Sequence, residues 1–143
     1  MKKISRKFRL ATVLKVAKLE EEAQQRATGA AAREQHAAEA EEMARQQAYA
    51  ARAPEAGPVS GAMFQQVSQA ARLKAEALHI AQNETVDATT RLELAREDLM
   101  MRARKTHTLE DLEERHKVAY AVHAALAAQR TLDDLVRARK VIR

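Results

Sequence analysis

The sequence predicts an all-α protein in which two long helices form an antiparallel coiled-coil hairpin, with the second helix the longer one. Both prolines and two of the three glycines lie in the eight residues from Pro54 to Gly61. Proline removes a backbone donor and clashes with the preceding turn, so helices stop there. The chain on either side is rich in strong helix formers such as Ala, Glu, Gln, Arg, Lys and Leu. We therefore expect one hairpin over residues 1–143, with helices at about 5–53 and 61–141 and a turn at about 54–60.

Composition limits the kind of core and the class of protein. Four aromatics and 32 alanines among 143 residues suit a thin two-helix seam, because a thick core needs large interdigitating side chains. No long apolar run is present, and Lys15 and Lys18 interrupt the stretch that would follow the basic start of a signal peptide. Without cysteine there is no disulfide, thiolate metal site or cysteine nucleophile. We expect a soluble cytoplasmic protein.

The net charge of +5 hides a gradient along the chain. Residues 1–19 contain seven basic side chains and no acid, and residues 99–143 have a net charge of +4. Residues 20–56 and 57–98 have net charges of −4 and −2. Folding at residue 57 would place about +11 at the end with the termini and about −6 at the turn. The two ends should therefore meet different surfaces.

The first helix contains a strict seven-residue apolar repeat. Its members are Val16, Ala23, Ala30, Ala37, Ala44 and Ala51. Further alanines widen the stripe: Ala17, Ala27, Ala31, Ala38, Ala40 and Ala48. A seven-residue period indicates left-handed supercoiling against a partner helix. Because each alanine buries little area, we expect the pair to be marginally stable alone.

The second helix repeats by seven as well, in more than one frame. The first frame is Leu78, Thr85, Leu92, Leu99 and Thr106, flanked by Ala81, Ala88 and Ala95. A second frame follows at Leu109, Leu112, His116, Ala119, His123 and Leu126. Leu132, Leu135 and Ile142 are out of phase with Leu126, which predicts a stutter. Ser60 is placed to cap the start of this helix.

The unequal helices predict an overhang. A turn centred near residue 57 pairs residue n with residue ~114 − n, so the second helix has no intrachain partner beyond about residue 113. Apolar side chains continue there and call for another protein: Tyr120, Val122, Leu126, Leu132, Leu135, Val136 and Ile142. In the alternative, a capping box at Thr108–Asp111 starts a third helix that folds back into a bundle.

Two Glu-x-x-His motifs, Glu76/His79 and Glu113/His116, resemble half of a di-iron carboxylate site. They lie about 37 residues and ~55 Å apart on one predicted helix, so we interpret them as solvated flanks. His116 and His123 are one heptad apart, whereas metal binding on one helix normally uses i, i+4 spacing. No phosphate loop, nucleophile elbow or triad is present. We predict no enzyme, no cofactor, no metal site and no small-molecule substrate.

Nucleic acid and membrane are weaker interpretations of the basic start. Its cations, Lys2, Lys3, Arg6, Lys7 and Arg9, could bind phosphate, but the chain lacks the aromatics that stack bases. Ile4 and Phe8 lie on one face of a short amphipathic segment that could touch a membrane surface. A solvated terminus is the simpler interpretation of the same residues.

Both ends of the chain carry a family resemblance. The segment Phe8-Arg-Leu-Ala-Thr-Val-Leu-Lys-Val-Ala-Lys-Leu-Glu-Glu-Glu-Ala23 is similar to the opening of the FliJ family of flagellar type III export proteins. The close, Thr131-Leu-Asp-Asp-Leu-Val-Arg-Ala-Arg139, resembles the family's Leu-Asp-Glu-Leu ending. Length, mid-chain turn and unequal helices agree over the whole chain.

The resemblance implies a non-catalytic stalk or adaptor on the cytoplasmic face of the cell membrane. It would couple a hexameric export ATPase to the membrane export gate, handle export chaperones, and meet the membrane only indirectly. We expect the ATPase to bind the terminal end at Phe8, Leu14, Tyr120, Leu126, Leu132 and Leu135.

By the same resemblance, Tyr49, Phe64 and Ala71 match the gate-contacting surface near the turn. The predicted register adds Met63 and Val67, because residue 49 would face residue ~65. Other members carry large residues where this chain has Glu42, Arg45 and Ser68. The competing class is a self-associating or nucleic-acid-binding coiled-coil hairpin, in which the overhang pairs with another copy.

Overall fold

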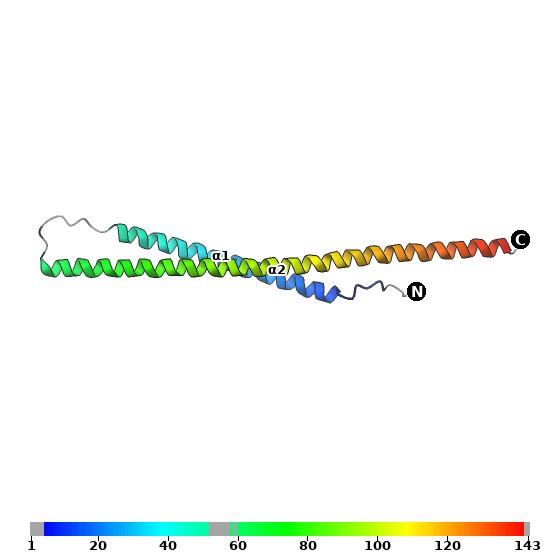
Figure 1. Cartoon of the computed structure of the whole chain (residues 1–143), viewed down its shortest axis with the longest axis horizontal. Helices are drawn as coiled ribbons and strands as arrows, with labels where there is room; N and C mark the ends of the chain where they lie inside the picture. The colour runs from blue at the N-terminus through cyan, green and yellow to red at the C-terminus, as the bar shows by residue number, and fades with distance from the viewer. Residues whose placement is uncertain (1–4, 52–57, 59, 142–143) are drawn as a thin grey trace. The chain divides into compact units, whose positions relative to one another are not determined.

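The computed structural model describes residues 5–51, 58 and 60–141. Over these residues the chain forms two α-helices, α1 (Ala11–Ala50) and α2 (Gly61–Val141), and no strand (Figure 1). The helices pack against each other in opposite directions, and α2 is about twice as long as α1. The predicted all-α antiparallel hairpin with a longer second helix is therefore confirmed.

The helix ends differ in detail from the prediction. α1 begins at Ala11, whose amide donates to the carbonyl of Phe8 (3.2 Å), and it ends at Ala50. The predicted cap of α2 is present, since the hydroxyl of Ser60 accepts a hydrogen bond from the amide of Met63 (3.3 Å). Most of the predicted turn at 54–60 lies outside the described residues.

The alternative with a third helix is wrong. α2 runs without a break past Thr108, from Gly61 to Val141. The Thr108 hydroxyl donates to the carbonyl of Arg104 (2.9 Å), one turn back along the same helix. Its side chain therefore caps no new helix.

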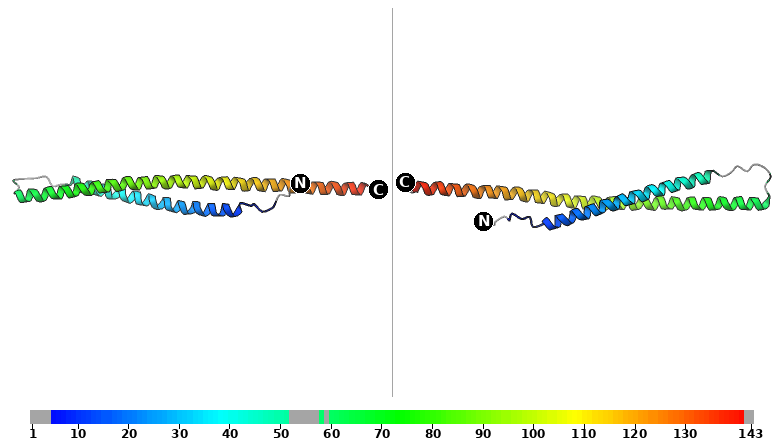
Figure 2. Two further views of the ribbon diagram at one scale, coloured as in Figure 1. Left: turned by 60° about the horizontal axis from the view of Figure 1, so that its bottom comes forward. Right: turned by 180° about the vertical axis from the view of Figure 1, so that it is seen from behind.

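The packing divides into two compact units, each containing a part of both helices. Unit 1 comprises Met1–Glu22 and Met101–Arg143, and unit 2 comprises Ala23–Met100. In unit 2 the cyan end of α1 lies beside the green part of α2 in both views of Figure 2.

Unit 1 is held by apolar side chains and by charges that cross between the helices. Leu14, Ala17 and Leu109 form its buried cluster. The Lys18 ammonium lies 2.8 Å from a Glu110 carboxylate oxygen. Further ion pairs join Glu20 to Arg102 and to Lys105, both at 3.5 Å.

Unit 2 is held by small side chains and by hydrogen bonds to a backbone carbonyl. Ala38, Ala81, Ala88 and Leu92 are its buried apolar residues. The Gln24 amide nitrogen donates to the carbonyl of Ala95 (3.1 Å). The Thr28 hydroxyl lies 3.2 Å from the same oxygen and 2.8 Å from the carbonyl of Gln24.

The period predicted for α1 is correct, but the phase of its main repeat is wrong. Of the alanines predicted to widen the stripe, Ala17, Ala31 and Ala38 do lie in the seam. The predicted repeat from Val16 to Ala51 is exposed at every position except the half-buried Ala30. The residues that face α2 follow two other rows, one from Leu14 to Tyr49 and one from Ala17 to Ala38. Alanine occurs at several heptad positions, and each buries too little area to fix the phase.

The first frame predicted for α2 is correct. Leu78, Thr85, Leu99 and Ala95 are half-buried, and Leu92, Thr106, Ala81 and Ala88 are buried. The second frame is correct only at Leu109, His116 and His123, which continue the first one. Leu112, Ala119 and Leu126 are exposed. The seam thus keeps one frame from Ala71 to His123.

The predicted register is also wrong, by about nine residues or roughly 14 Å. Seam residues pair so that their numbers add up to about 123, as in Leu14 with Leu109 and Thr28 with Ala95. The estimate from sequence assumed that the helices fold symmetrically about residue 57. Ten residues instead separate Ala50, the last residue of α1, from Gly61, the first residue of α2. No described residue of α1 is therefore level with the first three turns of α2.

Candidate partner-binding surfaces

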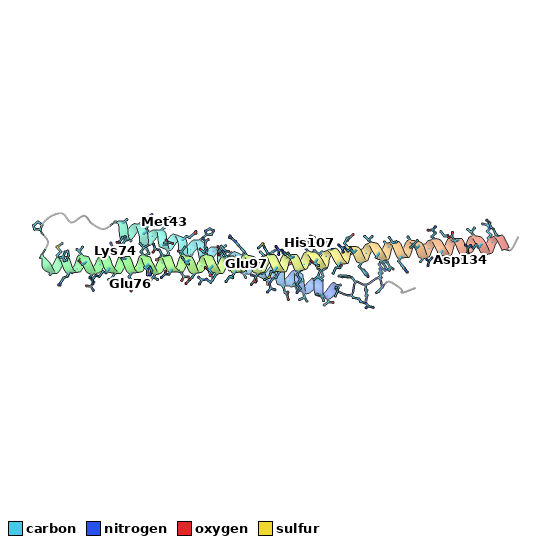
Figure 3. The ribbon with its side chains drawn as sticks, in the orientation of Figure 1. Met43, Lys74, Glu76, Glu97, His107 and Asp134 are labelled. Carbon is cyan, nitrogen blue, oxygen red and sulfur yellow. The ribbon has the colours of Figure 1, made fainter. Side chains whose placement is uncertain are left out.

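The last part of α2 in unit 1 presents apolar side chains that the chain leaves uncovered. Every residue from 124 to 140 is exposed. Figure 3 shows the side chains around Asp134 projecting from the helix with no other described segment against them. Leu126, Leu132 and Leu135, three of the residues predicted to bind a partner at this end, lie in this stretch. The overhang begins about ten residues later than predicted, because α1 reaches further along α2.

The other three residues predicted for the terminal end are covered within unit 1. Leu14 is buried in the apolar cluster. Phe8 is half-buried, and its ring centroid lies 5.6 Å from that of His116 at an interplanar angle of 51°. Tyr120 is half-buried as well. Leu14 and Phe8 thus contact α2 within the chain, and the three leucines are the more exposed of the six predicted residues.

The last part of α2 also contains an exposed apolar row, and the prediction named only some of its members. Val118, Val122, Leu132 and Val136 are each more than half exposed. Together with Ala125 they occupy five of six positions spaced alternately four and three residues apart, the spacing of a coiled-coil seam, and the sixth position is Gln129. The continuation of the intrachain seam carries different residues: Ala127, Arg130, Asp134 and Arg137. The exposed row thus lies on a different side of α2 from the seam.

Charge distinguishes the two units. Unit 1 contains 17 basic and nine acidic side chains, a net charge of +8, and unit 2 contains eight and eleven, a net charge of −3. Within unit 1 the hydrogen bond from Lys18 lowers the pKa of the Glu110 carboxyl and raises the pKa of the Lys18 ammonium. Unit 1 therefore combines an exposed apolar row with a net positive charge.

The residues predicted for the tip lie in unit 2 and at the start of α2. Met63, Phe64 and Val67 are exposed, and Tyr49 and Ala71 are half-buried. Phe64 lines a shallow hollow on one face of α2 with Gln65, Ser68, Gln69 and Arg72. The start of α2 thus offers an aromatic ring and a guanidinium on one surface.

The structure does not place Tyr49 opposite Phe64. Ala48 shares a hollow with Leu73, Lys74 and Ala77. The register puts Tyr49 level with about residue 74, ten residues or ~15 Å along α2 from Phe64. The expectation that residue 49 faces residue ~65 is therefore wrong, and the two rings belong to separate surfaces.

Nothing in the described part of the chain gathers into a catalytic or metal-binding cluster. Over those residues no group of three or more His, Cys, Asp or Glu side chains is placed to hold a metal ion. Glu113 pairs with Lys117 (3.1 Å), and His79 contacts Asn83 (3.4 Å). Across the described ranges, neither helix contains an apolar stretch that could span a bilayer.

A helical hairpin whose exposed features are apolar rows and charged faces is a coiled-coil interaction protein. The family model described as "Flagellar FliJ protein" matches residues 6–142, nearly the whole chain. The chain therefore belongs to the FliJ family and is a non-catalytic component of flagellar protein export. No curated protein and no solved structure matches it.

Proposed function

We propose that this chain is the stalk of a flagellar export apparatus, joining a hexameric export ATPase to the membrane export gate on the cytoplasmic side. In this proposal it also handles export chaperones. One observation carries the terminal end of the proposal: α2 continues past the end of its intrachain seam with an exposed apolar row. An exposed row of this length on a helix is a solubility liability unless a partner covers it.

The terminal end would bind the ATPase through Leu126, Leu132 and Leu135, supported by Val122 and Val136. Phe8, Leu14 and Tyr120 would contribute by holding α1 against α2 beside the site. The net charge of +8 in unit 1 would favour an acidic surface in the partner.

Co-purification with the ATPase tests this. Leu126→Asp with Leu135→Asp places two charges on the exposed apolar end of α2, on either side of the exposed row, and apolar anchors of this kind typically contribute ~2 kcal/mol or more to binding. Complex formation should be lost while helicity by circular dichroism is retained, because neither side chain contacts α1. Met43→Asp with Val86→Asp, equally exposed positions in unit 2, is the matched control. Unchanged ATPase binding by the first pair would refute the assignment, and tight binding of random-sequence DNA would favour the competing class.

The gate would contact the start of α2 through Met63, Phe64 and Val67, with Ala71 one heptad after Phe64. Tyr49 would contact the gate through a separate surface of unit 2. Phe64→Ala should abolish gate binding without changing the melting temperature, because the ring is 57% exposed. Tyr49→Ala should lower the melting temperature of the helix pair, since the ring is half-buried. Full gate binding and export by Phe64→Ala would remove the tip site from the proposal.

A further inference from the structure

Unit 2 has two unlike long faces, one on each side of its seam. Heptad positions that flank the seam of an antiparallel pair meet their counterparts on the same side. Glu34 of α1 lies 3.9 Å from Arg91 of α2, which identifies the flanking positions on one side. We call the surface on this side of unit 2 the alanine face.

Small side chains cover the α1 half of the alanine face. The heptad position of Glu34 and the adjacent outer position of α1 contain six alanines: Ala23, Ala27, Ala30, Ala37, Ala44 and Ala48. The α2 half adds Ala77 and a row of large apolar side chains, Leu73, Ile80 and Leu94, each about 60% exposed. A hollow lined by Ala48, Leu73 and Ala77, with the seam cations Arg45 and Lys74 at its edge, shows that the two halves meet.

The opposite face has the same length and a different composition. Its positions carry mainly polar side chains, among them Gln25, Glu39, Gln46, Gln82, Thr89 and Arg96. Met43 and Val86 are its isolated large apolar residues besides Met100. The contrast between the faces cannot come from the needs of the α1–α2 seam, because both faces are equally distant from it.

The charge of the alanine face is one-sided. It includes five carboxylates, on Glu34, Glu41, Glu84, Asp87 and Asp98, and one cation, Arg91. Arg91 is engaged by Glu84 (2.8 Å) and Glu34, and Glu41 is engaged by the neighbouring Arg45 (2.6 Å). Asp87 and Asp98 are the carboxylates of this face that lie outside those ion pairs. The polar face holds equal numbers of Lys/Arg and Asp/Glu side chains within unit 2. The net negative charge of unit 2 (−3) thus comes mainly from the alanine face.

We propose that the alanine face of unit 2 is a docking site for a basic amphipathic helix of another protein, which lies in the groove between α1 and α2. The alanines of α1 let the incoming backbone approach closely, and Leu73, Ile80 and Leu94 provide apolar knobs along one edge. Lys or Arg beside the apolar stripe of the incoming helix pairs with Asp87 and Asp98, the carboxylates of this face outside those ion pairs. This site is independent of the terminal and tip surfaces, so it does not rest on the stalk function.

The site from Leu73 to Leu94 spans ~32 Å, so a helix of about 24 residues fills it. The probe is therefore a synthetic helical peptide of that length, with Leu and Ala on one stripe and Lys beside it. An otherwise identical peptide with Glu in place of Lys tests the charge. Affinity for the full-length chain is measured by fluorescence anisotropy at low and moderate salt.

The full-length chain should bind the Lys peptide and reject the Glu peptide, with affinity falling as salt rises. Ile80→Gln with Leu94→Gln should weaken binding about tenfold or more, which corresponds to ~1.4 kcal/mol. Met43→Gln with Val86→Gln, at the same exposure on the polar face, should change it less than about twofold. The proposal is overturned if the wild-type chain does not prefer the Lys peptide, or if both pairs of substitutions weaken binding equally. It is also overturned if sedimentation equilibrium shows a dimer that only Ile80→Gln with Leu94→Gln dissolves, because a second copy would then occupy the face.

Discussion

The two units join the same pair of helices by different means. Unit 1 buries Leu14 against Leu109 and adds ion pairs across the seam. Unit 2 buries alanines around Leu92 and adds hydrogen bonds from Gln24 and Thr28 to one carbonyl. Large side chains tolerate some separation of the helices, whereas alanines and hydrogen bonds to backbone require close approach. We therefore expect unit 2 to tolerate enlarged seam residues poorly, and unit 1 to depend on its two buried leucines.

The largest effect is expected in unit 1. Leu109→Ala removes the side chain that covers Leu14 and Ala17, and such truncations cost about 2–3 kcal/mol. Amide hydrogen exchange should accelerate in the first turns of α1 and much less in unit 2. Leu112→Ala, on an exposed neighbour, is the control. Equal acceleration by the two variants would contradict a local apolar core in unit 1.

In unit 2 we expect the larger effect from enlarging a buried alanine, because an alanine has little side chain to remove. Ala88 is 1% exposed, so Ala88→Leu forces the helices apart at a cost of about 1–3 kcal/mol. The midpoint of urea unfolding should fall, while Ala75→Leu, at an exposed position of the same helix, should leave it unchanged. A gain in stability from Ala88→Leu would mean that the seam of unit 2 contains unfilled space.

The smallest effect comes from the ion pair of Lys18 with Glu110. Because the pKa of Glu110 is lowered from its ordinary 4.5, its contribution is present above that pH and is lost as the pH falls through the folded value. The pKa of Lys18 is raised from 10.5, so its contribution is present below that pH and is lost as the pH rises through the folded value.

The melting temperatures of wild type and Glu110→Gln should therefore differ slightly and constantly between about pH 5 and 10, and converge as the pH falls through the folded pKa of Glu110. Both side chains are about half exposed, so the difference should also vanish in high salt. A difference that persists once the Glu110 carboxyl is protonated would show that packing, and not the charge, is responsible.

The sequence predicted the two helices, their order and the seam of α2 because the relevant signals are strong. Proline and glycine interrupt the chain once, and Leu78, Leu92 and Leu99 fix the phase of α2 by their size. The phase of α1 could not be predicted in the same way. Its most regular repeat, from Val16 to Ala51, consists mostly of alanines and flanks the seam instead of forming it.

Sequence reasoning placed the exposed leucines of the overhang correctly but assigned covered residues to the same surface. Leu126, Leu132 and Leu135 were identifiable as apolar residues without an intrachain partner. Phe8 and Tyr120 could not be separated from them, because that requires the register. The register depends on where α1 ends relative to the start of α2, and no residue pattern within the helices encodes it.

The pairing register is the central claim, because it determines where the overhang begins and which faces remain free. The chain has no cysteine, so engineered pairs report on it directly. Ala38→Cys with Thr85→Cys joins positions that the observed register sets opposite each other, and a disulfide requires Cα atoms about 4.4–6.8 Å apart. This pair should cross-link rapidly on mild oxidation, and Ala38→Cys with Glu76→Cys, the pair expected from a symmetric fold at residue 57, should stay reduced. Cross-linking of the second pair and not the first would contradict the register, the extent of the overhang and the surfaces derived from both.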